Sequence, residues 1–158
     1  MIDRIYDEHF MECAIKEAKK AKIGKEQFPI GAVVVHNGEI IGWGTSKDKH
    51  THDPTDHAET IAVRQACKWL RREYLGDCTL FTTAEPCQMC LSVIFQVRIG
   101  EIVYGAHRKD LPMRKKNISI EHLVQDAGYE PVITKGVLAS KCLALFRQRK
   151  VLPPKGKK

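Results

Sequence analysis

The sequence predicts an α/β fold in which helices cover both faces of a central sheet, giving three layers. Segments rich in β-branched residues alternate with segments whose apolar residues recur every three or four positions, and this alternation is typical of strands and helices that pack as layers. The 158 residues, 43% of them hydrophobic and 28% charged, suit one globular domain with a sizeable core. We assign residues 1–150 to this single domain and 151–158 to a basic, disordered tail.

The first half of the chain should contain a helix, a hairpin and a second helix. Residues 7–23 carry apolar side chains at helical spacing, and this helix should end near Gly24. Two β-branched runs in IGAVVVHNGEIIGWG are joined by Asn37 and Gly38, the pair that best supplies the positive φ angles of a two-residue turn. The sheet should therefore begin with two antiparallel strands. The helical spacing returns over residues 58–71.

The second half should alternate strands with helices. The string CTLFTT, residues 78–83, has the β-branched and aromatic content of a strand. Pro86 fits the first position of the following helix, because its missing N–H is not needed there and its φ is already helical. The remaining elements are expected as strands at 101–105 and 131–136 and as helices at 119–128 and 137–149.

Three side chains from two separate strings have the chemistry of zinc ligands. His57 lies in HDPTDHAE, whereas Cys87 and Cys90 lie three apart in EPCQMC, at a predicted helix start where free N–H groups and the helix dipole favour thiolates. Zinc binds thiolate and imidazole ligands tetrahedrally, and a catalytic site leaves its fourth position to water. A C-x-x-C pair alone is as typical of redox or structural sites, and His-x-Glu alone is a weak signal. Together, in this order, they predict a catalytic zinc site.

Glu59, two residues after His57, is the candidate proton carrier. Bound zinc can lower the pKa of its water from about 15.7 to about 7, and a nearby carboxylate can pass the released proton to a departing amine. Residues two apart diverge on a regular helix, so we expect His57 and Glu59 at the first turn, one reaching the metal and the other the bound water. A closed structural site would need a fourth ligand, for which the nearest candidates are His50, His52 and Cys78.

The combination H-x-E and P-C-x-x-C resembles the signature of the zinc-dependent cytidine and deoxycytidylate deaminase superfamily. The strings PIGAVVVHNGEIIG, HDPTDHAE, TTAEPCQMC and RIGEIVYGA resemble the branch of bacterial tRNA-specific adenosine deaminases, guanine deaminases and fungal-type cytosine deaminases. The resemblance covers roughly residues 8–106, and KGVLASKCLALF again looks like the tRNA enzymes. It implies a cytidine-deaminase-like α/β/α sandwich around a five-stranded mixed sheet, and a homodimer.

The resemblance also implies the roles of individual residues. His57, Cys87 and Cys90 would hold one zinc ion per chain, Glu59 would carry protons, and the backbone at Ala58 would help to hold the base. The implied reaction replaces an exocyclic amine of a nucleobase by a carbonyl and releases ammonia, with adenosine in tRNA as the leading substrate. Two alternatives stay open: a deaminase of a free base or nucleoside (guanine, cytosine or adenosine), and a non-catalytic, zinc-stabilised module that binds RNA.

The candidate substrate residues lie mostly where the chain departs from these relatives. The tRNA adenosine and guanine deaminases usually place an Asn after the second strand, where this chain offers Thr45 and Ser46, whose hydroxyls replace part of that contact. Phe28, before the first strand, either stacks on the substrate ring or belongs to the core. His107 stands where the tRNA enzymes commonly have Arg, and either contacts the base or a phosphate or is an ordinary loop residue. Asp56 replaces a small Ala and has no role that the sequence explains.

Positive charge is concentrated in two segments of a chain whose net charge is +7. Residues 108–116 carry five positive charges and one negative, and residues 147–158 carry six positive charges and none negative. Such clusters are typical of contact with nucleic-acid phosphates, and equally of solubilising segments.

No apolar run approaches the roughly 18 residues that a membrane span needs, and the first residues show no secretory signal. We therefore expect a cytoplasmic protein without membrane contact. The scattered cysteines are expected to be free thiols in the core, as is usual inside cells. They are Cys13, Cys67, Cys78 and Cys142.

Overall fold

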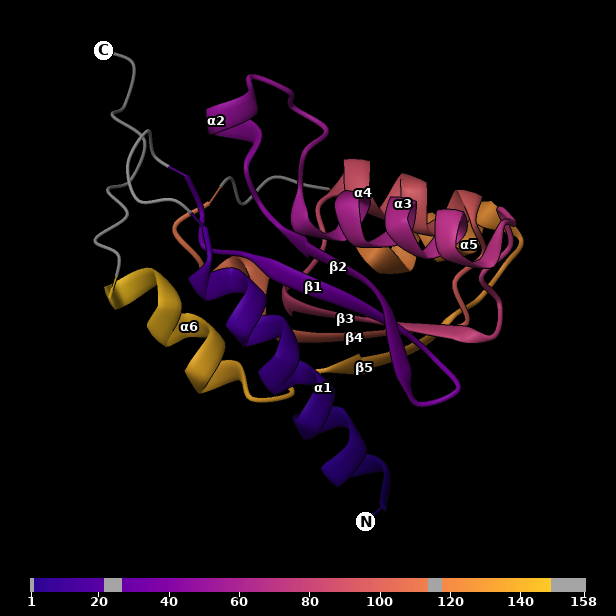
Figure 1. Ribbon diagram of the computed structural model, residues 1–158, viewed down its shortest axis with the longest axis horizontal. Helices are drawn as coiled ribbons and strands as arrows, with labels where there is room; N and C mark the ends of the chain where they lie inside the picture. The colour runs from indigo at the N-terminus through magenta and orange to yellow at the C-terminus, as the bar shows by residue number, and fades with distance from the viewer. Residues whose placement is uncertain (1, 22–26, 114–117, 149–158) are drawn as a thin grey trace.

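The protein folds into three layers, with helices on both faces of one sheet (Figure 1). The computed structural model describes residues 2–21, 27–113 and 118–148. In chain order the elements are α1 (Ile2–Lys19), β1 (Gly31–His36), β2 (Glu39–Thr45), α2 (Asp48–Thr51), α3 (Ala58–Leu70), β3 (Cys78–Ala84), α4 (Gln88–Gln96), β4 (Glu101–Ala106), the 3₁₀ helix η1 (Arg108–Asp110), α5 (Ile120–Ala127), β5 (Val132–Lys135) and α6 (Ala139–Gln148). Helices α1 and α6 lie on one face, and α3, α4 and α5 lie on the other (Figure 1). The α/β fold class is confirmed.

The sheet has five strands in the order β2-β1-β3-β4-β5 and is mixed. Strand β1 pairs antiparallel with β2 and β3, whereas β3 with β4 and β4 with β5 are parallel. The predicted hairpin is confirmed, because Asn37 has a φ of 50° and Gly38 a φ of 78° between the paired strands β1 and β2. Positive φ at both central residues is typical of the turn whose twist matches that of the strands.

Glycines in β2 allow α3 to lie directly against the sheet. A Cβ atom on Gly44 would stand 2.1 Å from the backbone oxygen of Ala58, and one on Gly42 would stand 2.2 Å from that of Ala62. Neither position can hold a larger residue unless the helix moves away. This close approach determines where the first turn of α3 lies relative to the end of β2.

Helix α1 differs from the sequence prediction at both ends. Helix α1 begins at Ile2 and ends at Lys19, earlier at both ends than the predicted 7–23, and Gly24 lies outside the described residues. An ion pair between Arg4 and Glu8, with Nε and Oε1 3.0 Å apart, stabilises the added first turns.

Pro86 is not the first residue of α4, so that prediction is wrong. Cys87 is the N-cap with extended φ and ψ of −75° and 166°, and the helix begins at Gln88. Pro86 is buried in the preceding connection, where its fixed φ suits an extended chain as well as a helix. The predicted strands and the helices at 58–71, 119–128 and 137–149 are present with slightly different ends. The short elements α2 and η1 were not predicted from the sequence.

All six cysteines are free. Cys78 and Cys142 are buried and Cys13 and Cys67 are half-buried, which confirms the prediction of free thiols for these four. Among the described residues, no helix is both long and apolar enough to cross a membrane. The predicted tail, 151–158, and residues 114–116 of the first basic segment lie outside the described residues.

Candidate metal centre and active site

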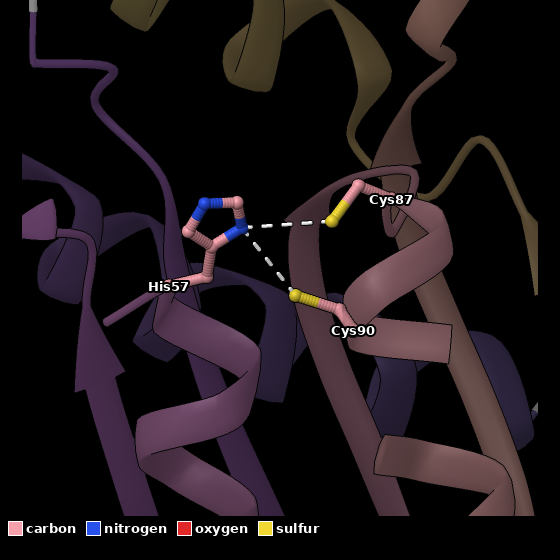
Figure 2. A group of neighbouring side chains, drawn as sticks. All are labelled: His57, Cys87 and Cys90. Atoms are coloured by element: carbon pink, nitrogen blue, oxygen red, sulfur yellow. Dashed lines mark hydrogen bonds between the residues drawn. The ribbon is translucent and has the colours of Figure 1, made fainter. Parts of the chain in front are cut away.

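The first turns of α3 and α4 bring the three candidate zinc ligands together. His57 is the N-cap of α3 and Cys87 the N-cap of α4, while Cys90 lies in the first turn of α4. The Nδ1 atom of His57 lies 3.6 Å from the Sγ of Cys87 and 3.5 Å from the Sγ of Cys90 (Figure 2). Two helices that start side by side, after β2 and β3, thus direct one imidazole and two thiols at one point.

These distances fit a single zinc ion. Zn–S bonds of about 2.3 Å and Zn–N bonds of about 2.0–2.1 Å at a tetrahedral angle place a sulfur and a nitrogen ligand roughly 3.6 Å apart. The three ligand atoms all lie within 4.8 Å of one another. Both the donor types and their spacing therefore suit zinc, and the group is able to hold one metal ion.

The group does not include a fourth protein ligand in the part of the chain that the structure describes. His50 and His52, which the sequence offered, lie in and just after the separate helix α2 and are not members of the group. Cys78 begins β3, whereas Cys87 follows the end of that seven-residue strand, so the strand holds them about 20 Å apart. A site with three protein ligands leaves one position free, as catalytic zinc sites do.

Hydrogen bonds join the two thiols and the imidazole and shift their pKa values. A hydrogen bond from the Cys90 thiol, supplemented by one from His57, lowers the pKa of Cys87 to about 4. The same bond to Cys87, together with burial, raises the pKa of Cys90 well above its ordinary value. The hydrogen bond with Cys87 also raises the pKa of His57. Zinc binds thiolates and neutral imidazole, so a zinc ion that binds there would displace the protons that these side chains carry.

Glu59 lies beside this group without being part of it. Its side chain is buried, at 3% exposure, and desolvation is the main cause that raises the pKa of its carboxyl. Its Oε1 accepts a hydrogen bond from Thr82 Oγ1 at 3.2 Å, and its Oε2 lies 3.5 Å from the Sγ of Cys90. Thr82 lies on β3 and was not recognised in the sequence, although it is a polar residue in a strand that leads to the cysteines.

Ser46 and Ala58 contact each other. The Oγ of Ser46 accepts a hydrogen bond from the Ala58 N–H at 3.2 Å, and both residues are buried. Thr45, the other hydroxyl offered by the sequence, points to the opposite layer, where its Oγ1 donates to the backbone oxygen of Glu17 at 3.0 Å. Of the two hydroxyls, only that of Ser46 reaches the start of α3.

Phe28 and His107 are half-buried residues at the edge of the core, before β1 and after β4. Phe28 is half-buried and packs against Phe146 of α6 with ring centroids 6.1 Å apart. His107 follows β4, and its Nδ1 lies 3.3 Å from the hydroxyl of the buried Tyr104. It also lines a pocket of about 300 Å³ beside the start of α5. Among the described residues, neither makes a hydrogen bond or ring contact with His57.

Two further polar residues support the segment that leads into α3. Asp56 faces Arg64, with Oδ1 and Nη1 3.6 Å apart, a contact that the sequence did not predict. The side chain of the buried Gln27 was not singled out in the sequence. It donates to Asp48 Oδ1 at 2.9 Å and accepts from the Lys49 N–H at 3.0 Å, so it attaches α2 to the loop before β1. No local pattern in the sequence indicates this contact.

Comparison with known proteins agrees with the fold and with the site. Residues 4–106 match the family model described as the cytidine and deoxycytidylate deaminase zinc-binding region. The chain is 40% identical over 148 residues to the tRNA-specific adenosine deaminase of Buchnera aphidicola, covering 91% of this chain and 90% of that protein. It is 45% identical over 82 residues to the guanine deaminase of Bacillus subtilis, covering 52% and 53% of the two chains.

A solved structure from a study of A-to-I editing by tRNA:A34 deaminases superposes with a TM-score of 0.75 at 32% identity, over 87% of this chain and 98% of that one. Fold and site thus define a zinc-dependent hydrolytic deaminase. The chain belongs to the cytidine and deoxycytidylate deaminase family.

Proposed function

We propose that this enzyme deaminates adenosine to inosine within tRNA. The observation that carries the substrate assignment is the similarity to a tRNA-specific adenosine deaminase along about nine-tenths of both chains. In the reaction a water oxygen replaces the exocyclic amine, so that a C–O bond forms, a C–N bond breaks and ammonia leaves. We further propose that residues 1–150 form the single deaminase domain, with 151–158 as a basic tail.

The proposed roles follow from the contacts in the site. His57, Cys87 and Cys90 hold zinc, which when bound supplies a hydroxide nucleophile at neutral pH by lowering the pKa of its water to about 7. Glu59 takes the proton released from water and delivers it to the departing amine. Its burial favours proton uptake, because desolvation raises the pKa of the carboxyl. Thr82 holds one carboxyl oxygen in place and leaves the other beside the metal group.

We propose that Ala58, Ser46, Phe28 and His107 surround the base. The backbone at Ala58 and the hydroxyl of Ser46 lie at the start of the same helix as His57 and Glu59. Ser46 accepts through its oxygen, and its own O–H can donate to an acceptor on the base. Phe28 and His107 are both half-buried, which leaves part of each ring available to a base or ribose.

Deamination of a free base or nucleoside is the second candidate. It is supported by the 45% identity over 82 residues to a guanine deaminase. The non-catalytic module is not supported, because it requires four protein ligands and the described group has three.

We also propose that the enzyme is a cytoplasmic homodimer. A cytoplasmic location would bring it to its tRNA substrate. Dimerisation is supported by large apolar side chains that are exposed on the single chain, among them Trp69 at 67% and Tyr74 at 57%.

The test is to incubate the zinc-loaded protein with a tRNA pool and, separately, with a panel of free bases and nucleosides. Ammonia release reports any deamination, and mass spectrometry of digested tRNA reports inosine. We expect inosine in tRNA and little turnover of the panel. Turnover of free guanine with none on tRNA would replace the first candidate by the second.

A further inference from the structure

The N-cap residue of α3 does not cap the helix with its side chain. The first amide groups of a helix have no acceptor inside the helix, and an N-cap side chain usually supplies one. His57 has the extended conformation of an N-cap, with φ −82° and ψ 153°, yet its side chain makes no capping hydrogen bond. Its Nδ1 points at Cys87 and Cys90 instead. Helix α3 therefore needs acceptors from elsewhere.

Ser46 supplies one of these acceptors from the end of β2. Its Oγ accepts the N–H of Ala58, the first helical residue, at 3.2 Å. The exposed fractions are 3% for Ser46 and 0% for Ala58, so water does not offer a ready replacement. The first amide of α3 is thus satisfied by a hydroxyl twelve residues earlier in the chain.

The hydroxyl of Ser46 is held in place by its backbone surroundings. The N–H of Ser46 donates to the backbone oxygen of Ile30 at 3.0 Å, and the N–H of Lys47 donates to that of Asp56 at 3.1 Å. Two residues before Ser46, the missing side chain of Gly44 lets β2 touch the backbone of Ala58. The end of β2 and the start of α3 therefore form one rigid unit, with the hydrogen bond from Ala58 to Ser46 at its centre.

We propose that Ser46 is a positioning residue for the metal site. By accepting the buried N–H of Ala58, the residue after His57, it ties the start of α3 to the end of β2 and holds the backbone at His57 where the imidazole meets both sulfurs. The proposal rests on the proposed role of His57 as a zinc ligand, and it does not depend on which base is the substrate.

The test is the zinc affinity of the full-length Ser46→Ala protein, measured by competition with a chelator of known affinity. We expect zinc to bind about 10–100-fold more weakly, the range found when a residue that supports a metal ligand is removed. Ser46→Thr keeps the hydroxyl and should bind zinc nearly as the unchanged protein does. If Ser46→Ala does not fold, Ser46→Gly removes the same acceptor without a side chain to pack.

The matched control is Thr45→Val, which removes the neighbouring hydroxyl that bonds to Glu17 on α1. It should lower stability and leave zinc affinity unchanged within about twofold. The proposal is overturned if Ser46→Ala binds zinc as the unchanged protein does. If in addition only the KM for substrate rises, Ser46 acts solely as a substrate contact. Since zinc binding is measured without substrate, an error in the substrate assignment does not affect the outcome.

Discussion

The carboxyl of Glu59 and the thiol of Cys90 meet across two helices, with Oε2 and Sγ 3.5 Å apart. Glu59 is the second residue of α3 and Cys90 the third of α4. A carboxylate so close to a candidate ligand, and outside the ligand group, can exchange protons at the metal without binding it.

Replacing Glu59 should separate catalysis from metal binding. Glu59→Gln keeps the size and the polarity of the side chain but removes its proton-carrying group. We expect deamination to fall by about 10²–10⁴-fold, while the zinc content stays near one ion per chain. Ammonia release and metal analysis on the same preparation measure the two effects. An active Glu59→Gln enzyme would contradict the role of Glu59 as proton carrier.

Thr82 should affect the rate through Glu59. Thr82→Val removes the donor to Glu59 Oε1 at nearly constant volume, and loss of a hydrogen bond to a charged group corresponds to roughly 10-fold in rate or more. We expect kcat to fall while KM changes little. The control is Thr83→Val on the same strand, whose hydroxyl instead accepts from the Gly31 N–H. It should reduce stability and leave kcat per folded molecule unchanged. Equal effects of both changes on kcat would exclude a specific role for Thr82.

Removal of the metal should destabilise the fold. Zinc that binds only the native state adds stability that grows with the ratio of free zinc to the dissociation constant, about 4 kcal/mol at a thousandfold excess. We expect a chelator to lower the Tm by several degrees and added zinc to restore it. Cys87→Ser should show the lower Tm even with zinc present. A Tm that the chelator does not change would argue against a metal in the native protein.

The two close contacts between β2 and α3 should have different consequences for the metal. Gly44→Ala and Gly42→Ala each place a Cβ about 2 Å from a helix carbonyl, and such overpacking costs about 1–3 kcal/mol. Both should lower the free energy of unfolding in urea. Gly44→Ala displaces Ala58, next to His57, and should also weaken zinc binding in a chelator competition assay. Gly42→Ala acts at Ala62, one turn further along, and should leave zinc affinity nearly unchanged. Equal zinc affinities for the two variants would contradict this link.

Local rules explain which parts of the fold the sequence predicted. The turn at Asn37 and Gly38 depends on two residues that tolerate positive φ, and it is present in the structure. The helix that begins after His57 follows from apolar spacing over its own residues. The start of α4 was misjudged, because Pro86 suits the extended connection as well as the first helical position. The tertiary contacts around Pro86 determine whether it lies in the extended connection or in the first turn of the helix.

The sequence by itself determined the chemistry of the site. Imidazole, carboxylate and thiol groups at the spacings H-x-E and C-x-x-C indicate zinc and a proton carrier, since these properties belong to the side chains and to short stretches of backbone. Only the tertiary structure decided which groups meet. The sequence offers Ser46 as a substrate contact, but only the structure shows that its hydroxyl also accepts the N–H of Ala58. That contact depends on how closely α3 packs on the glycines of β2, and such packing depends on the whole sheet rather than on neighbouring residues.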